Sequence, residues 1–144
     1  MNKEINGISV NYDIKGNGDY VFILQGWGTS LEVYASVANL LAQKYTVVSF
    51  DFPGFGKTEE PKEVWDVSAY AKFTKAFIES FGQKNVILMG HSFGGRVILK
   101  LVSDEKLPFQ ISKILFVDCA GVMPQRSKKQ KMRTKIYKCG KFFL

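Results

Sequence analysis

The sequence has 144 residues, which is enough for one modest domain with a hydrophobic core. Hydrophobic residues make up 46% and charged residues 23% of the chain, a composition typical of globular proteins. The net charge of +7 is concentrated in residues 123–144, which hold eight lysines and arginines and no acid. Such a segment could touch nucleic acid or an anionic membrane, but no motif for reading nucleic acid accompanies it. We therefore interpret it as a solvated helix face and expect no nucleic-acid partner.

Composition also argues against several other classes of protein. No apolar run is long enough to span a bilayer, and residues 1–10 alternate polar and apolar side chains, unlike a secretory signal. The two cysteines, Cys119 and Cys139, lie outside any CxxC pattern and are expected to be free thiols in a reducing cytoplasm. Because the chain has one histidine and no Cys/His cluster, we expect neither a metal nor a cofactor.

The first half of the chain alternates apolar strands with an amphipathic helix. A strand is expected over residues 8–14, followed by a glycine-rich turn and a buried strand over 20–24. Thr29 or Ser30 should then cap a helix. Its expected apolar face consists of Val33, Val37, Leu40 and Leu41. A second buried strand follows over 45–50.

The second half repeats this alternation. A loop over 51–58 and a charged stretch over 59–66 precede a helix that Ser68 should cap. The apolar residues expected on this helix are Tyr70, Phe73, Phe77 and Ile78. Two more buried strands are expected over 86–89 and 114–117, with a helix over 94–102 between them.

This alternation predicts an α/β fold with a mostly parallel sheet of about six strands, covered by helices on both faces. In such sheets the functional site lies at the carboxyl ends of the strands. Three glycine-bearing segments fall there, at residues 25–28, 51–56 and 90–95. The last contains Gly-His-Ser-Phe-Gly, a GxSxG motif between a strand and a helix. A tight turn at this place would hold Ser92 in a strained conformation, with its hydroxyl above the sheet.

These segments resemble the α/β-hydrolase superfamily in order and in spacing. The GxSxG segment is similar to the family's nucleophile elbow, Gln25-Gly26-Trp27-Gly28 to its oxyanion loop, and the Asp-Phe-Pro-Gly-Phe-Gly run at 51–56 to the loop after its fourth strand. The resemblance implies that Ser92 is a nucleophile and that the backbone amides of Trp27 and Phe93 form an oxyanion hole. These two amides can converge only if the strands over 20–24 and 86–89 lie side by side and parallel, as the family's strand order also implies. It also implies that Gln25, Gly26, Trp27 and Phe93 bind the substrate.

Two features depart from the family pattern. Gln25 stands where the family commonly has histidine, a tolerable change because the oxyanion donor is a backbone amide. The family's acid and then its general-base histidine follow the nucleophile in chain order. The one histidine here, His91, lies inside the elbow and is interpreted as a packed or hydrogen-bonded residue. Asp118 ends the last expected strand, where a minority of the family places its acid, although a loop-capping aspartate is the favoured interpretation.

The resemblance therefore implies an incomplete hydrolase. We expect residues 1–122 to be the N-terminal part of the core and residues 123–144 to be the basic start of the cap over the active site. The expected partners are a small-molecule substrate and the missing C-terminal half of the same fold.

The predicted function is ester hydrolysis through Ser92 on a small, partly apolar substrate, with this chain inactive alone. The alternative is a non-catalytic remnant or binding module that retains the pocket. Two other motifs, a P-loop and a dinucleotide-binding GxGxxG, are not matched by the sequence. Asp51 occupies the first glycine position of a P-loop that would end at Gly56-Lys57-Thr58, and no GxGxxG is present. Asp51 is instead expected to anchor its own turn.

Overall fold

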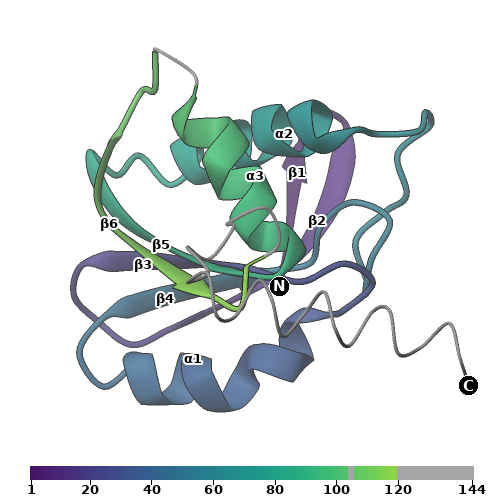
Figure 1. The fold of residues 1–144 in the computed structure, drawn as a ribbon. Helices are drawn as coiled ribbons and strands as arrows, with labels where there is room; N and C mark the ends of the chain where they lie inside the picture. The colour runs from purple at the N-terminus through teal and green to yellow at the C-terminus, as the bar shows by residue number, and fades with distance from the viewer. Residues whose placement is uncertain (104–105, 120–144) are drawn as a thin grey trace, which may run out of the picture.

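The strands and helices expected from the sequence are present in the computed structural model, which describes residues 1–103 and 106–119 (Figure 1). Within these residues the strands are β1 (Asn2–Ile5), β2 (Ile8–Lys15), β3 (Tyr20–Leu24), β4 (Thr46–Phe50), β5 (Asn85–His91) and β6 (Gln110–Val117). The helices are the 3-10 helix η1 (Leu31–Tyr34) and the α-helices α1 (Ala35–Leu41), α2 (Val67–Glu79) and α3 (Phe93–Val102).

The strands form one sheet in the order β1-β2-β4-β3-β5-β6. The strands β4, β3, β5 and β6 run parallel to one another, and β2 joins β4 antiparallel. The register pairs Ile23 with Met89 and Leu24 with Gly90, so the ends of β3 and β5 lie side by side. This confirms the predicted α/β class and the predicted adjacency of these two strands.

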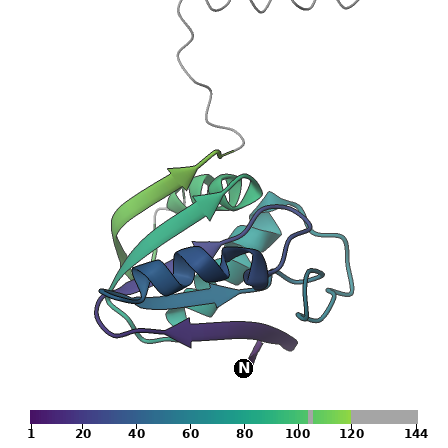
Figure 2. The same cartoon turned by 90° about the horizontal axis from the view of Figure 1, so that it is seen from below.

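Helices cover both faces of the sheet, with α2 and α3 on one side and α1 on the other (Figures 1 and 2). Strand β3 shows how alternate side chains serve the two faces. Phe22 and Leu24 pack in the larger core under α2 and α3, whereas Val21 and Ile23 pack in the smaller core under α1. The larger core is aromatic: Phe50 stacks on Phe77 with ring centroids 4.2 Å apart. A continuous apolar strand is therefore buried on both faces, as a parallel sheet requires.

The first helix does not present the face that the sequence suggested. Leu41 packs against the smaller core as expected, but Val33 and Leu40 are each 66% exposed and Val37 is 38% exposed. Tyr34 and Ala38 are buried instead. The prediction was wrong because the segment begins as a 3-10 turn, whose tighter winding rotates the later residues away from the expected stripe. Ser30 precedes this turn, but its side chain makes no capping hydrogen bond.

The helix α2 begins two residues earlier than expected. Asp66 is its N-cap, and its carboxylate accepts a hydrogen bond of 2.8 Å from the backbone amide of Ala69. Ser68, the predicted cap, lies inside the helix, so that prediction was wrong. The predicted apolar face is confirmed, since all four of its members are buried.

Strand β6 pairs only with β5 among the described residues and so forms an edge of the described sheet. The apolar run at residues 114–117 predicts a buried strand, whereas the incomplete sheet implied by the family resemblance predicts an open edge with only partly covered faces. These residues are between 37% and 42% exposed, which confirms the open edge. A strand without a second neighbour keeps one flank open to solvent. The predicted boundary at residue 122, the basic segment and Cys139 lie outside the described residues. Within the described ranges, no helix is both long and apolar enough to cross a membrane.

Candidate active site

The turn between β5 and α3 holds Ser92 in an unusual backbone conformation. Its φ is 48° and its ψ is −108°, outside the regions that residues other than glycine commonly occupy. The carbonyl of Ser92 accepts a hydrogen bond from Gly95 at 3.2 Å, and its amide donates one to Val117 at 3.3 Å. The turn thus has the strained form predicted for a nucleophile elbow.

Glycine at position 94 allows this turn to sit close to β3. A Cβ atom there would come closer than 3.0 Å to the carbonyl oxygens of Leu24 and Gln25. The start of α3 therefore packs directly on the backbone at the end of β3. This contact brings the loop after β3 beside the elbow.

The backbone amides of Trp27 and Phe93 lie on these two neighbouring segments. Within residues 1–103 and 106–119, neither amide donates a hydrogen bond to another residue. Phe93 is the first residue of α3, where an amide has no acceptor in its own helix. The rings of the two residues are in edge-to-face contact, with centroids 5.0 Å apart. Two unpaired donors therefore flank the elbow, one from each segment.

A hydrogen-bond network joins the loop after β3 to the end of η1 and to the elbow. The amide of Gly26 donates to the hydroxyl of Tyr34 at 2.8 Å, and that hydroxyl lies 2.8 Å from Nδ1 of His91. His91 is thus a hydrogen-bonded elbow residue, as its sequence position suggested. Nothing in the sequence pattern singled out Tyr34 as its partner.

The side chain of Gln25 belongs to the same network. It is 1% exposed, and its Nε2 donates to the carbonyl of Thr29 at 2.7 Å. Direct substrate contact by this side chain, expected from the family resemblance, does not agree with its burial. Gln25 shapes the loop instead, because its position at the end of a buried strand turns it into the core. Gly26, also expected to contact substrate, has its amide occupied by Tyr34.

The carboxylate of Asp51 ties three segments around the same edge of the sheet. It is completely buried, and it accepts hydrogen bonds from the amide of Leu31 at 2.7 Å, the amide of Lys57 at 2.9 Å and the side chain of Asn11 at 2.8 Å. The predicted anchoring of its own turn is confirmed. The links to η1 and β2 are contacts between distant parts of the chain that no local pattern reveals.

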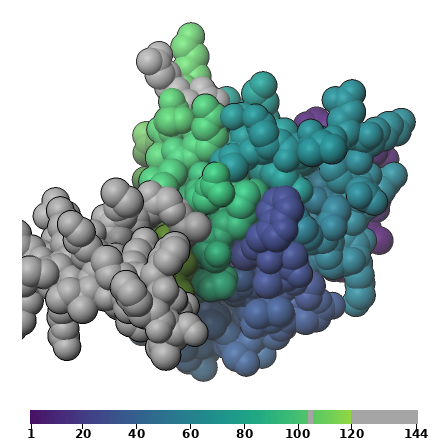
Figure 3. Space-filling view, turned by 45° about the vertical axis from the view of Figure 1, so that its right-hand side comes forward, coloured from purple at the N-terminus to yellow at the C-terminus, as the bar shows by residue number. Residues whose placement is uncertain are grey.

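A cavity of about 450 Å³ opens beside Ser92. Its lining residues are Trp27, Trp65, Asp66, Val67, Ser92, Phe93 and Arg96. They come from the loop after β3, the approach to α2 and the start of α3, which meet on one face of the molecule (Figure 3). Sequence reasoning missed Trp65, Asp66, Val67 and Arg96. The available signals were a tryptophan within a charged stretch and an arginine one helical turn after the serine.

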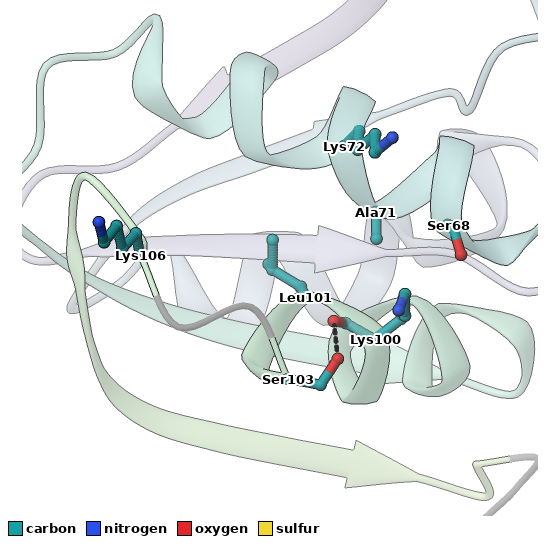
Figure 4. Close-up of a pocket in the computed structure, with 7 residues that line it drawn as sticks. All are labelled: Ser68, Ala71, Lys72, Lys100, Leu101, Ser103 and Lys106. Atoms are coloured by element: carbon teal, nitrogen blue, oxygen red, sulfur yellow. Dashed lines mark hydrogen bonds between the residues drawn. The ribbon is translucent and has the colours of Figure 1, made fainter.

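A larger cavity of about 690 Å³ lies between α2 and α3 (Figure 4). Its lining includes Lys72, Lys100 and Lys106, and the hydroxyl of Ser103 there donates to the carbonyl of Lys100 at 2.7 Å. It lies away from the carboxyl ends of the strands and has no serine with a strained backbone. The smaller cavity is therefore the candidate active site.

Asp118 follows β6 with a φ of 44°, and its side chain is exposed. It does not line the cavity beside Ser92. Its neighbour Cys119 donates from Sγ to the carbonyl of Gly90 at 3.0 Å, and burial raises the pKa of this thiol. Among the described residues, no three histidine, cysteine, aspartate or glutamate side chains gather as metal ligands do.

Comparison with known proteins agrees with this geometry. Residues 19–133 match the family of proteins with the alpha/beta hydrolase fold, and the chain belongs to that family. It is 29% identical over 102 residues to a soluble epoxide hydrolase of Corynebacterium sp., and 29% identical over 107 residues to a fluoroacetate dehalogenase of Burkholderia sp.. Each alignment covers 71% of this chain, with 36% of the epoxide hydrolase and 35% of the dehalogenase.

The fold is also that of solved structures. A membrane phospholipase A, a bacterial virulence factor, aligns with a TM-score of 0.79 and 24% identity, over 94% of this chain and 44% of that one. The chain thus spans about a third of the length of the two curated relatives and less than half of this structure. The family assignment rests on the match over residues 19–133, and the two curated relatives are hydrolases by name.

Proposed function

We propose that the chain carries the nucleophile and the oxyanion hole of a serine hydrolase that cleaves esters of small, partly apolar substrates. The observation that carries this proposal is the strained backbone of Ser92 at the mouth of a cavity. A strained serine between a strand and a helix is the arrangement that exposes a nucleophile for attack. The aromatic lining residues Trp27, Trp65 and Phe93 suit an apolar part of the substrate.

The reaction would proceed by acyl transfer. The Oγ atom of Ser92 attacks the ester carbonyl carbon and loses its proton to a general base. The negative charge that develops on the carbonyl oxygen is stabilised by the amides of Trp27 and Phe93. The carbon–oxygen bond to the alcohol then breaks, the base returns the proton to the leaving alkoxide, and water hydrolyses the acyl-enzyme.

The 144 residues contain no histidine suited to be that base. The single histidine, His91, has its Nδ1 atom 2.8 Å from the hydroxyl of Tyr34. We therefore infer that this chain alone is inactive and that base and acid come from polypeptide outside it. Asp118, at the end of β6, is retained as a candidate acid, to be oriented against such a histidine.

The lack of a base also favours the second candidate function, a non-catalytic module that binds small molecules in the same cavity. The two candidates differ in whether Ser92 reacts. Exogenous imidazole can test this, because the cavity is open to a base supplied from solution.

The experiment measures release of p-nitrophenolate from p-nitrophenyl acetate by the 144-residue chain and by Ser92→Ala. Without imidazole, the two proteins should give equal rates. With imidazole, the unmodified chain should release p-nitrophenolate faster than Ser92→Ala at every imidazole concentration, after subtraction of the protein-free rate. Ser103→Ala, a change of a serine outside the cavity, should retain the full rate. Equal rates for the unmodified chain and Ser92→Ala in imidazole would reject the hydrolase and favour the binding module.

A further inference from the structure

The cavity beside Ser92 contains a cationic group whose role the proposed reaction does not explain. Arg96 lies in the first turn of α3, is exposed, and lines the cavity. Within residues 1–103 and 106–119, no ion pair or hydrogen bond joins its side chain to another residue. Because Cα–Cβ bonds tilt toward the start of a helix, its long side chain can reach back toward the elbow.

The position of Arg96 in α3 adds to the positive electrostatic potential around its side chain. The first turn of a helix is the positive end of the helix dipole, where acids are favoured and an arginine is not. The single acid that lines the cavity is Asp66. Its Oδ1 atom caps α2 by accepting from the amide of Ala69 at 2.8 Å, and the carboxylate keeps its negative charge. Arg96 is the single cation among the residues that line the cavity, so its guanidinium is the group that can bind an anion there.

The walls of the cavity are apolar next to this charge. Trp27 is 62% exposed despite its size, and its ring contacts Phe93 at 5.0 Å and Phe55 at 4.9 Å between centroids. Trp65, half-buried, packs against Tyr70 at 5.3 Å. An exposed aromatic surface that is held rigid by other rings is typical of a binding site.

We infer that this cavity selects ligands with a carboxylate on a small apolar body, the carboxylate bound by Arg96 and the body by Trp27 and Trp65. The planar fork of N–H donors on a guanidinium matches the two oxygens of a carboxylate, which it can bind through two parallel hydrogen bonds. The inference that this preference selects the substrate rests on the proposed function. The binding preference itself does not depend on catalysis.

The two tryptophans of the chain both line the cavity, so intrinsic fluorescence reports its occupancy directly. The test titrates the 144-residue chain with 4-phenylbutanoate and with its neutral counterpart, 4-phenylbutanamide. The acid should bind about fivefold to tenfold more tightly than the amide, as expected for a charge-assisted hydrogen bond that is partly screened by water. Higher salt should reduce this ratio.

Three variants separate this inference from its alternatives. Arg96→Gln should bring the ratio close to one, and Arg96→Lys should retain only part of the preference. Lys100→Gln, a change at an exposed cation of the same helix that lines the other cavity (Figure 4), should leave the ratio unchanged.

A ratio near one in the unmodified chain, a preference that survives Arg96→Gln, or no fluorescence change with either ligand would overturn the inference. The esterase assay and the binding titration have separate readouts, so a failed esterase assay with an intact preference would reject the proposed reaction and not the carboxylate site.

Discussion

Replacing Asp51 by asparagine tests the idea that one buried carboxylate holds the rim of the candidate site together. The side chain is completely buried and accepts three hydrogen bonds, from Asn11, Leu31 and Lys57. Asparagine keeps one acceptor oxygen and turns a donor toward at least one of these partners. The variant therefore loses one or two charge-assisted hydrogen bonds and leaves a buried donor unpaired.

Each such loss costs about 1.5–3 kcal/mol, so Asp51→Asn should lower the free energy of unfolding by about 2–4 kcal/mol. For a chain of this size the melting temperature should fall by roughly 6–12 °C. The assay is urea denaturation at low protein concentration, followed by circular dichroism, with the midpoint and slope compared.

Asp13→Asn is the matched control for this measurement. Asp13 makes an exposed ion pair with Lys15 at 3.2 Å, and its side chain is 41% exposed. Its replacement should change the free energy of unfolding by less than about 0.5 kcal/mol, as for other surface pairs. The reasoning is refuted if Asp51→Asn is no more destabilising than Asp13→Asn.

Three further changes test the packing around the elbow and the sheet edge. Gly94→Ala should destabilise the chain by about 2 kcal/mol and abolish ligand binding in the cavity, because a Cβ there meets the backbone of β3. The control Gly82→Ala adds a Cβ that meets no atom within 4 Å, so it should cost only the backbone strain of about 1 kcal/mol and leave binding intact. Urea denaturation and ligand titration, both followed by fluorescence, compare the two variants. The open edge at β6 should make the chain self-associate. Leu115 is 42% exposed on this strand, and Leu115→Lys should shift the elution of the chain in size-exclusion chromatography toward the monomer. A stable monomer of the unmodified chain would count against this. In a Cys139→Ser background, Cys119 should react with iodoacetamide more slowly than a model thiol at pH 8, because burial raises its pKa and keeps it neutral; a rate equal to the model thiol would contradict this.

The parts of the fold that the sequence predicted are those with strong local signals. Apolar runs predicted the buried parallel strands, and the glycines on either side of Ser92 predicted a tight turn, which the φ of 48° confirms. The adjacency of β3 and β5 followed from the need for two amides to converge, combined with the family resemblance. The register of Leu24 with Gly90 confirms it.

The parts that were missed depend on contacts between distant segments. The 3-10 start of the first helix changed which residues are buried, because a tighter winding is invisible to a 3.6-residue pattern. The bond between Tyr34 and His91 joins residues 57 positions apart. Trp65 and Arg96 reach the site only once α2 and α3 pack side by side, so neither could be placed there from its neighbours in sequence.

Acylation of Ser92 itself tests the central claim most directly. The chain is incubated with p-nitrophenyl acetate and imidazole, stopped with acid, digested and mapped by mass spectrometry. The proposal predicts an acetyl group on the peptide that contains Ser92, at much higher occupancy than on the peptide with Ser103, and its loss in Ser92→Ala. An unmodified Ser92 peptide, or acetylation equal to that at Ser103, would contradict the assignment of Ser92 as a nucleophile.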